Sequence, residues 1–339
     1  MRAGGGRVPV SVLDRSRVRA GRPEGEALRE TVALARHVEG LGYHRFWVAE
    51  HHGVPGVAGS APTVLAAAVA SATTTLRVGT GGVMLPNHRP LVVAEQFGVL
   101  EALFPGRIDV GLGRSVAFTD GIRRALGAGR DAAENFPHDL AELVAYFTGG
   151  PRDHPQVHAR PAEGLRPPVF VLATGAGAEI AGRAGLALVI GEVRGREALR
   201  EAVGLYRAAF TPSPLWHRPH LVLSATVMAA PTRQEARRLA APEAWAMAQA
   251  RTRGSFPPLD PVESVLRQLG QDAGARETEL YERQLAGQVA GSAEEVADRL
   301  DADLADLGAD ELLLTTSTHD PAAVRTSYEL LAGAWAGRA

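Results

Sequence analysis

The chain has 339 residues, of which 45% are hydrophobic and 22% are charged, so it is long enough for one large domain or two ordinary ones. Its 36 basic and 38 acidic residues give a formal net charge of -2, which excludes a broad field favouring nucleic acid or an anionic membrane. Every basic residue is arginine, and the absence of lysine excludes a P-loop lysine or a lysine Schiff base.

The sequence also contains no cysteine, which excludes disulfides, thiolate metal sites and cysteine nucleophiles. The first residues lack the apolar run of a signal peptide, and no stretch approaches the roughly 18 apolar residues of a membrane span. We therefore expect a cytoplasmic protein.

In the first half of the chain, short Val/Ile/Leu runs alternate with helical patterns that begin near Pro, Ser, Thr or Asp and end near Gly. Each run predicts a strand, and the pattern after it predicts a helix. The predicted strands are residues 7–13, 45–49, 76–80 and 108–112, and the predicted helices are residues 25–41, 63–72, 91–103 and a region to about residue 147.

The alternation of predicted strands and helices continues beyond a Pro/Gly-rich loop at residues 149–168. The polar stretch 251–285 interrupts it and predicts an insertion or mobile lid before the last βα unit. The further strands are residues 169–173, 186–190, 221–228 and 312–314, and the further helices are residues 178–184, 196–210, 232–250, 292–307 and 321–335.

Eight β-then-α units predict an α/β protein with a (β/α)₈ barrel, formed as a single domain over residues 1–339. The continuous apolar strands favour a parallel sheet that is covered on both faces. An open, doubly wound sheet is the alternative.

In such a barrel the functional residues follow the carboxyl ends of the strands. The candidates are His51 and His52, Gly81 and Gly82, Gly113 and Arg114, Thr174 to Gly177, and Gly191 and Glu192.

His51 and His52 suit proton transfer, because histidine is the side chain whose unperturbed pKa lies near neutrality. The alternative is a pair that only satisfies backbone groups at a strand end. Adjacent residues leaving a strand point to opposite faces, so the two are poorly placed to share one ion. Without thiolates or an HExxH motif, we predict no metal site.

Thr174-Gly175-Ala176-Gly177 follows a strand and opens a helix, where free N–H groups can hold a phosphate. It is not a dinucleotide fingerprint, because Ile180 stands where glycine or alanine is required, and a tight turn is the alternative. Arg114 is a second candidate for phosphate, with a surface ion pair as its alternative.

Gly81 and Gly82 leave bare backbone on which a flat ring could lie, although they could also form only a turn. Residues 113–117 resemble the GxSxG motif of a nucleophile elbow, but Ala117 stands where the second glycine is required. This argues against a serine hydrolase.

Several stretches together resemble the bacterial luciferase-like family of flavin-dependent monooxygenases, in family order over essentially the whole chain. Within the family, the similarity extends to the subgroup that includes an oxygenase of mensacarcin polyketide biosynthesis. The stretches are LGYHRFWVAEHH, LRVGTGGVMLPNHRP, AEQF-x4-ALFPGRIDVGLGRS, AGLALVIG and GSAEEVADRLDADLADLGADELLL.

The resemblance implies a barrel that uses reduced FMN, supplied by a separate reductase, and O2 to oxidise a small organic substrate, such as an aromatic polyketide in antibiotic biosynthesis. It assigns acid-base catalysis to His51 and the flavin floor, with a non-proline cis peptide, to Gly81 and Gly82. It assigns the phosphate to Arg114 and to Thr174, Gly175, Gly177 and Ala178. Gly113 stands where luciferases carry a reactive cysteine, so light emission is not expected.

Two other functions remain open: hydride transfer with the deazaflavin F420, which some members of the superfamily bind, and flavin binding without catalysis. The resemblance also implies a homodimer through the helices after the second and third strands. There Ala66, Ala67, Ala68, Ala70 and Ala72 form a small-residue surface, and Arg89 and Glu95 could pair across it. The alternative is an inner helix face that packs on the barrel.

Overall fold

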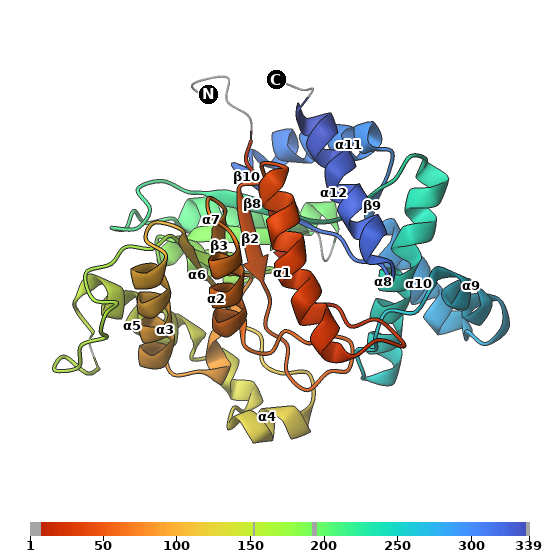
Figure 1. Ribbon diagram of the computed structural model, residues 1–339. Helices are drawn as coiled ribbons and strands as arrows, with labels where there is room; N and C mark the ends of the chain where they lie inside the picture. Colours follow the sequence, from red (N-terminus) through yellow and green to blue (C-terminus); the bar gives the residue numbers. More distant parts are fainter. Residues whose placement is uncertain (1–7, 152, 192–194, 337–339) are drawn as a thin grey trace. The chain divides into compact units, whose positions relative to one another are not determined.

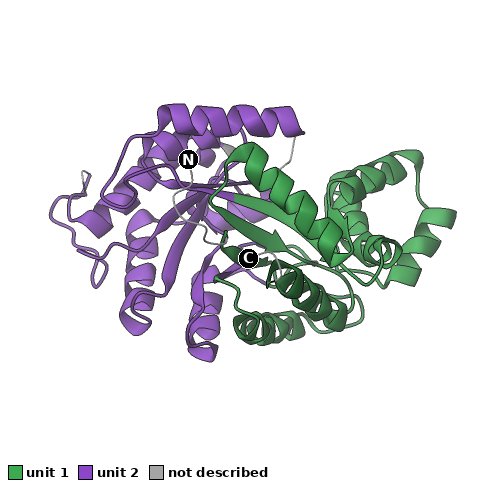
Figure 2. Ribbon diagram, turned by 90° about the horizontal axis from the view of Figure 1, so that it is seen from above, with its two compact units in different colours: residues 1–44, 54–58, 223–339 green, residues 45–53, 59–222 purple. Residues whose placement is uncertain are grey.

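The computed structural model describes residues 8–151, 153–191 and 195–336. The start of the first predicted strand and the candidate Glu192 lie outside these residues. The chain divides into two compact units (Figure 2). Unit 1 consists of Met1–His44, Val54–Ala58 and Leu223–Ala339, and unit 2 consists of Arg45–Gly53 and Gly59–Val222.

Unit 2 alternates strands and helices in the predicted chain order (Figure 1). Pro62 and Pro90 open two of its helices, because a proline at the first helical position lacks only an N–H that has no partner there. The strands are β2 (Arg45–Val48), β3 (Arg77–Thr80), β4 (Val83–Met84), β5 (Ile108–Gly113), β6 (Val169–Leu172) and β7 (Ala187–Gly191). The helices are α2 (Pro62–Ala72), η1 (Leu85–Asn87), α3 (Pro90–Leu103), α4 (Asp120–Leu126), η2 (Arg130–Ala133), α5 (Phe136–Thr148), α6 (Gly177–Arg183) and α7 (Arg196–Ala209).

Unit 1 contains the first βα unit and nearly all of the chain from β8 (Leu221–Ala229) onward. Its α11 (Ala293–Leu307) begins with the capping box that the sequence predicts, since the Ser292 hydroxyl accepts from the Glu295 N–H and the Glu295 carboxylate accepts from the Ser292 N–H. The other elements are β1 (Val10–Asp14), α1 (Glu24–Gly40), α8 (Arg233–Arg253), α9 (Val262–Gln271), α10 (Ala275–Ala286), β9 (Val289–Gly291), β10 (Glu311–Thr315) and α12 (Pro321–Ala336).

The strands form one sheet in the order β10-β1-β2-β3-β5-β6-β7-β8-β9, and β10 also pairs with β8. This last pairing closes a ring of eight strands, so the fold is the predicted α/β barrel rather than an open sheet. Strands β2, β3, β5, β6 and β7 are parallel to their neighbours within unit 2, as β1 is to β10 within unit 1.

The structure differs from the sequence prediction mainly in the segments that connect the predicted strand-helix pairs. The helical region before residue 147 is broken into α4, η2 and α5, and the short strands β4 and β9 were not predicted. The polar stretch 251–285 contains α9 and α10, which pack on α8 around Trp245 and Tyr281. Among the described residues, no helix is both long enough and apolar enough to cross a membrane.

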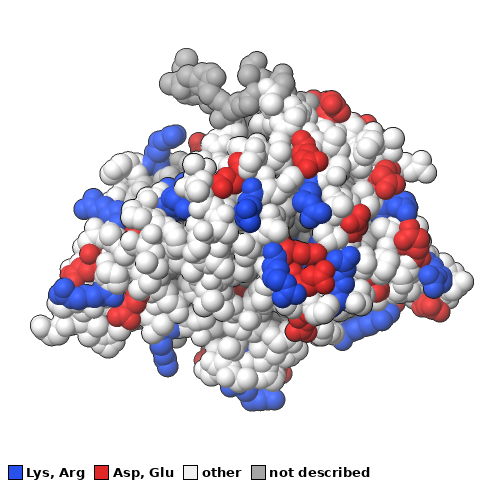
Figure 3. Space-filling view, in the orientation of Figure 1, with Lys and Arg blue, Asp and Glu red and all other residues white. Residues whose placement is uncertain are grey.

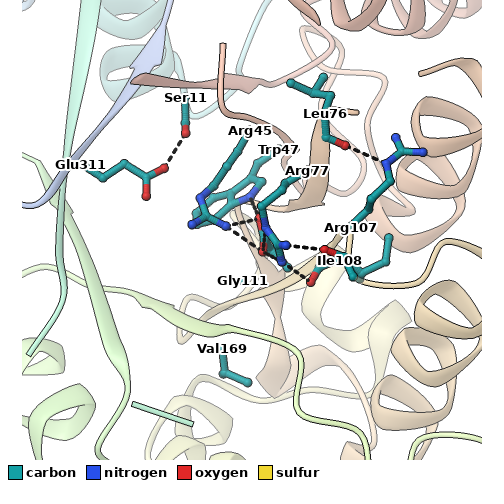
Figure 4. Close-up of polar contacts among 12 residues, drawn as sticks. Ser11, Arg45, Trp47, Leu76, Arg77, Arg107, Ile108, Gly111, Val169 and Glu311 are labelled. Atoms are coloured by element: carbon teal, nitrogen blue, oxygen red, sulfur yellow. Dashed lines mark hydrogen bonds and ion pairs between the residues drawn. The ribbon is translucent and has the colours of Figure 1, made fainter. Parts of the chain in front are cut away.

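A buried carboxylate links the amino ends of three strands of unit 2. Asp109 of β5 is fully buried and accepts hydrogen bonds from Arg45 of β2 at 2.8 and 2.9 Å and from Arg77 of β3 at 2.6 and 3.0 Å. The indole N–H of Trp47 adds a third donor at 3.1 Å. Figure 4 shows the side chains of Arg45, Trp47 and Arg77 directed toward one another. These hydrogen bonds lie at the amino ends of the strands, where side chains of a parallel barrel stabilise the sheet. The carboxyl ends are the side on which such barrels carry their functional residues.

Candidate active site

The candidate residues of unit 2 follow the carboxyl ends of neighbouring parallel strands. Val48 of β2 is level with Thr80 of β3, and Gly113 of β5 is level with Leu172 of β6. The Gly81 N–H also donates to the Val48 carbonyl at 2.8 Å. The histidine pair, the glycine pair, Arg114 and the loop from Thr174 therefore lie along one edge of the sheet.

His51 is held at both its backbone and its ring. Its N–H donates to the Gly59 carbonyl at 2.8 Å, and its imidazole stacks on the Phe118 ring with centroids 6.1 Å apart and planes 18° apart. The Phe118 side chain is 56% exposed, so the stacked pair lies at the surface. The imidazole is only partly buried, which suits a group that exchanges protons with a bound molecule.

His52 contacts a different set of groups from His51. Its Nε2 lies 2.8 Å from Glu50 Oε1, and its ring is tilted against the ring of His88 at a centroid distance of 6.4 Å. The two adjacent imidazoles therefore contact different groups, as expected for neighbouring residues that leave a strand.

Glu50 is a buried carboxylate that collects donors from two segments. It accepts from the Met84 N–H at 3.0 Å, from Asn87 Nδ2 at 3.3 Å and from His88 Nε2 at 3.0 Å, as well as from His52. Burial opposes ionisation, but the hydrogen bonds from His52 and His88 outweigh it and lower the pKa of Glu50 to about 2. The carboxylate is thus ionised and ties the end of β2 to the segment after β4.

The sequence analysis missed this cluster. Glu50 and His88 belong to quoted motifs, but no pattern in the chain joins residues 38 positions apart. Glu50, His52 and His88 bring potential metal-ligating atoms within 4.8 Å of one another.

The peptide bond between Gly81 and Gly82 is cis, as the resemblance implied. Gly82 also lies directly on β5, since a Cβ atom there would be 2.9 Å from the Gly111 carbonyl oxygen. Only glycine allows this close approach without a shift of the backbone, so the chain after β3 packs main chain on main chain against β5.

The loop after β6 is open where a phosphate would bind. Thr174 and Ala176 are exposed, and Gly175 has φ of 59°, the left-handed region that favours glycine. A cavity of about 280 Å³ borders the loop on the side of β7 and α7. Ala178 differs from the others, because it is buried and its N–H donates to the Gly175 carbonyl at 2.9 Å. Its N–H is therefore engaged within the loop.

Arg114 lies beside this loop. A Cβ atom at Gly177 would be 2.8 Å from the Ala173 side chain, which requires glycine there, and 3.5 Å from Arg114 Cδ, which is an ordinary contact that places the arginine next to the loop. Arg114 forms no ion pair with any residue that the structure describes, in contrast to the surface ion pair considered as its alternative. A guanidinium without an ion-pair partner among the described residues, next to the start of α6, has the chemistry that binds a phosphate.

Gly113 lies against Met84, because a Cβ atom there would be 2.7 Å from the methionine sulfur. A cysteine at this position would require Met84 to move. Gly191 ends β7 and borders the cavity beside Thr174, and its neighbour Glu192 lies outside the described residues.

The carboxyl edge of the barrel thus carries an imidazole, a glycine pair and an arginine that forms no ion pair with the described residues, which is where α/β barrel enzymes place their active sites. The model of the family described as luciferase-like monooxygenase matches residues 8–311. The chain belongs to the luciferase-like monooxygenase family.

Individual relatives agree with this assignment. A luciferase-like monooxygenase of Escherichia coli K12 is 35% identical over 331 residues, which cover 95% of this chain and 96% of that protein. The crystal structure of apo-MsnO8 is similar with a TM-score of 0.86 and 32% identity, covering 97% of this chain and 98% of MsnO8. MsnO8 is the mensacarcin-pathway oxygenase of the subgroup that the motifs resemble.

A more distant structure shares the fold. The oxygenating constituent of 3,6-diketocamphane monooxygenase from Pseudomonas putida, in complex with FMN, has a TM-score of 0.71 and 18% identity. The alignment covers 98% of this chain and 99% of that one.

Proposed function

We propose that this protein is a monooxygenase that uses reduced FMN and O2 to oxidise a small organic molecule. The proposal rests chiefly on the alignment of His51, Gly81 and Gly82, Arg114 and the loop from Thr174 along one edge of the sheet of unit 2. Reduced FMN, when bound, supplies the electrons that activate O2.

The residues divide the binding of the cofactor among them. The N–H groups of Thr174, Gly175 and Gly177 and the Arg114 guanidinium bind the phosphate, with Ala178 supporting the loop from within. The backbone of Gly81 and Gly82 accommodates the flat ring. An imidazole nitrogen of His51 holds and moves the proton needed during oxidation, while Phe118 limits the access of water to it.

Replacement of His51 tests this function directly. We expect His51→Gln to retain the fold and the affinity for reduced FMN, and to lower product formation by about 10²- to 10⁴-fold, the usual contribution of acid-base catalysis. The measurement is single-turnover product formation after the enzyme with reduced FMN is mixed with O2. The control is His154→Gln, an exposed histidine of the same unit, which should have wild-type turnover. Equal turnover in the two variants would remove His51 from the mechanism.

The choice of cofactor is decided by titration with reduced FMN and reduced F420. Reduced FMN and reduced F420 both present a flat tricyclic ring and a phosphate. The backbone of Gly81 and Gly82 and the loop from Thr174 therefore do not discriminate between the two cofactors. We expect the protein to oxidise substrate with reduced FMN and O2. Hydride transfer with reduced F420 would identify the alternative activity, and FMN affinity without product would identify a non-catalytic flavin-binding protein.

The substrate class that we propose is an aromatic polyketide of secondary metabolism, including antibiotic biosynthesis. The support is the 32% identity to MsnO8 over nearly all of both chains. Aromatic polyketides should therefore be the first compounds in the turnover assay. We further propose that a separate reductase supplies the reduced FMN.

We also propose that the protein is a homodimer through α2 and α3. These helices carry Val64, Val92, Val99 and Leu103, four of the seven exposed large hydrophobic side chains among the described residues. Their inner faces are also apolar, and a helix that is apolar on both faces is usually covered on both. Arg89 and Glu95 could pair across such an interface.

A further inference from the structure

The cluster of Glu50, His52 and His88 has the composition of a metal site. It offers one carboxylate oxygen and two imidazole nitrogens, all within 4.8 Å of one another. Two imidazoles and a carboxylate are a common ligand set for divalent first-row transition ions, Zn²⁺ among them. The candidate active site uses none of these three side chains, since His51 contacts Phe118 instead.

The spacing of the ligand atoms is close to what an ion requires. In a tetrahedral Zn²⁺ site with bonds of about 2.0–2.1 Å, neighbouring ligand atoms lie roughly 3.3 Å apart. Nε2 of His52 lies 2.8 Å and Nε2 of His88 lies 3.0 Å from the Glu50 carboxylate, so the imidazoles need to move outward by only a few tenths of an ångström. The side chains of His52 and His88 are 20% and 30% exposed, which leaves room for this movement and a path for the ion.

Asn87 provides an independent observation at the same place. Its Nδ2 is directed at Glu50 Oε1 from 3.3 Å, while its Oδ1 is buried and has no hydrogen-bond partner among the described residues. Exchanging the amide oxygen and nitrogen by a half-turn would direct the unsatisfied carbonyl oxygen into the cluster as a fourth ligand. Met84 would hold the carboxylate from outside, because its N–H already donates to Glu50 Oε2 at 3.0 Å.

We propose that Glu50, His52 and His88, together with the amide oxygen of Asn87, bind a divalent transition-metal ion of the Zn²⁺ type. The ion joins the end of β2 to the segment that follows β4, and so fixes the backbone on either side of His51 and Gly82. Its role is structural, because no ligand position is shared with the candidate cofactor site. The binding itself does not depend on the proposed function, since it requires neither flavin nor substrate.

The experiment is a calorimetric titration of Zn²⁺ into the chelator-treated full chain without flavin, followed by visible absorption of the protein loaded with Co²⁺. We expect one equivalent of tightly bound ion, a tetrahedral Co²⁺ spectrum and a melting temperature that rises with Zn²⁺. His88→Gln keeps a donor to Glu50 but removes a ligand, so it should weaken Zn²⁺ binding more than tenfold, since loss of an outer-shell partner alone typically weakens binding about 10- to 100-fold.

The matched control is His158→Gln. His158 is exposed and lies 2.8 Å from Glu163, so it is a histidine-carboxylate pair that could collect Zn²⁺ without a built site. This variant should bind the ion as the wild type does. Failure of the wild type to bind one equivalent, or equal affinity in the two variants, would overturn the proposal and leave a hydrogen-bonded cluster. If His88→Gln does not fold, His52→Gln takes its place with the same expectations.

Discussion

At the scale of single residues, Arg114 offers the sharpest test of the cofactor site because it forms no ion pair with the described residues. If it binds the flavin phosphate, Arg114→Gln should weaken reduced FMN at least tenfold, since hydrogen bonds to charged groups contribute about 1.5–3 kcal/mol. Riboflavin lacks the phosphate and should bind the variant and the wild type alike. The measurement is an anaerobic fluorescence titration with both flavins.

The exposed Arg124 provides the control for charge, so Arg124→Gln should bind reduced FMN as the wild type does. A variant at position 114 that still prefers FMN over riboflavin as strongly as the wild type does would contradict the assignment.

The sequence carries residue-level information wherever function follows from position on a strand. The positions of His51, Gly81 and Arg114 at one edge of the sheet were predictable because each follows an apolar run and parallel strands place such residues together. The divergence of His51 and His52 was predictable from backbone geometry alone. The contact of His88 with Glu50 was not predictable from the sequence. It depends on the course of the chain through β4 and η1, and neither element has a pattern long enough to detect.

At the scale of elements, the loop after β1 is joined to α8 by a buried ionic cluster of unit 1. Glu243 of α8 is buried and lies 2.7 Å from Arg15 Nη2 and 3.0 Å from Arg17 Nε. Burial opposes ionisation of Glu243, but the two arginines together hold its pKa below the ordinary value. Burial likewise lowers the pKa of Arg17, to about 10, although Glu243 opposes this.

Glu243→Gln should lower the free energy of unfolding by about 3–5 kcal/mol at pH 7, because it leaves the buried Arg17 guanidinium without its counter-charge. A carboxyl group with a lowered folded pKa stabilises the native state above its ordinary pKa and loses this effect as the pH falls through the folded value. The difference between variant and wild type should therefore shrink below about pH 4. Urea unfolding at several pH values measures it.

The exposed pair of Glu263 and Arg238 supplies the control. Glu263→Gln should change the free energy of unfolding by less than about 1 kcal/mol, as surface ion pairs do. A difference at position 243 that is constant from pH 7 to pH 3 would show that the carboxylate charge is not what stabilises this cluster.

The elements that the sequence failed to predict are those without a regular period. Prolines and glycines obscure α9 and α10 in the stretch 251–285, although the structure packs both on α8 and Trp245 Nε1 donates to Gln268 Oε1 at 2.9 Å. Long helices with a regular period, such as α1 and α11, were predicted to within one residue. That the stretch moves as a lid stays a prediction.

At the scale of the whole molecule, the charge pattern agrees with the net charge of -2. The face in Figure 3 carries red and blue side chains side by side, without a field of one sign, and the surface over α2 is uncharged. Composition alone predicted the mixture of charges of both signs. It could not predict the uncharged surface, because residues such as Val64 and Leu103 are identified as exposed only once the inner faces of α2 and α3 are known.

The exposed apolar side chains of α2 and α3 make the proposed dimer testable. The outward face is built from Val64 on α2 and Val92, Val99 and Leu103 on α3, and the two helices are joined by a 3.0 Å hydrogen bond between Thr63 and Gln96. We expect a dimer by analytical ultracentrifugation, and a monomer when Val64 and Leu103 are both replaced by glutamate, because like charges would then face each other across an isologous interface.

The control for added charge is Leu266→Glu. Leu266 is 49% exposed and lies on α9 of unit 1, which is not one of the two helices of the proposed interface, so this variant should remain dimeric. The double variant should keep the wild-type melting behaviour at low concentration, because neither side chain belongs to the core. If the wild-type protein sediments as a monomer at every concentration, the apolar face of α2 and α3 is not covered by a second copy. The dimer proposal would then be wrong.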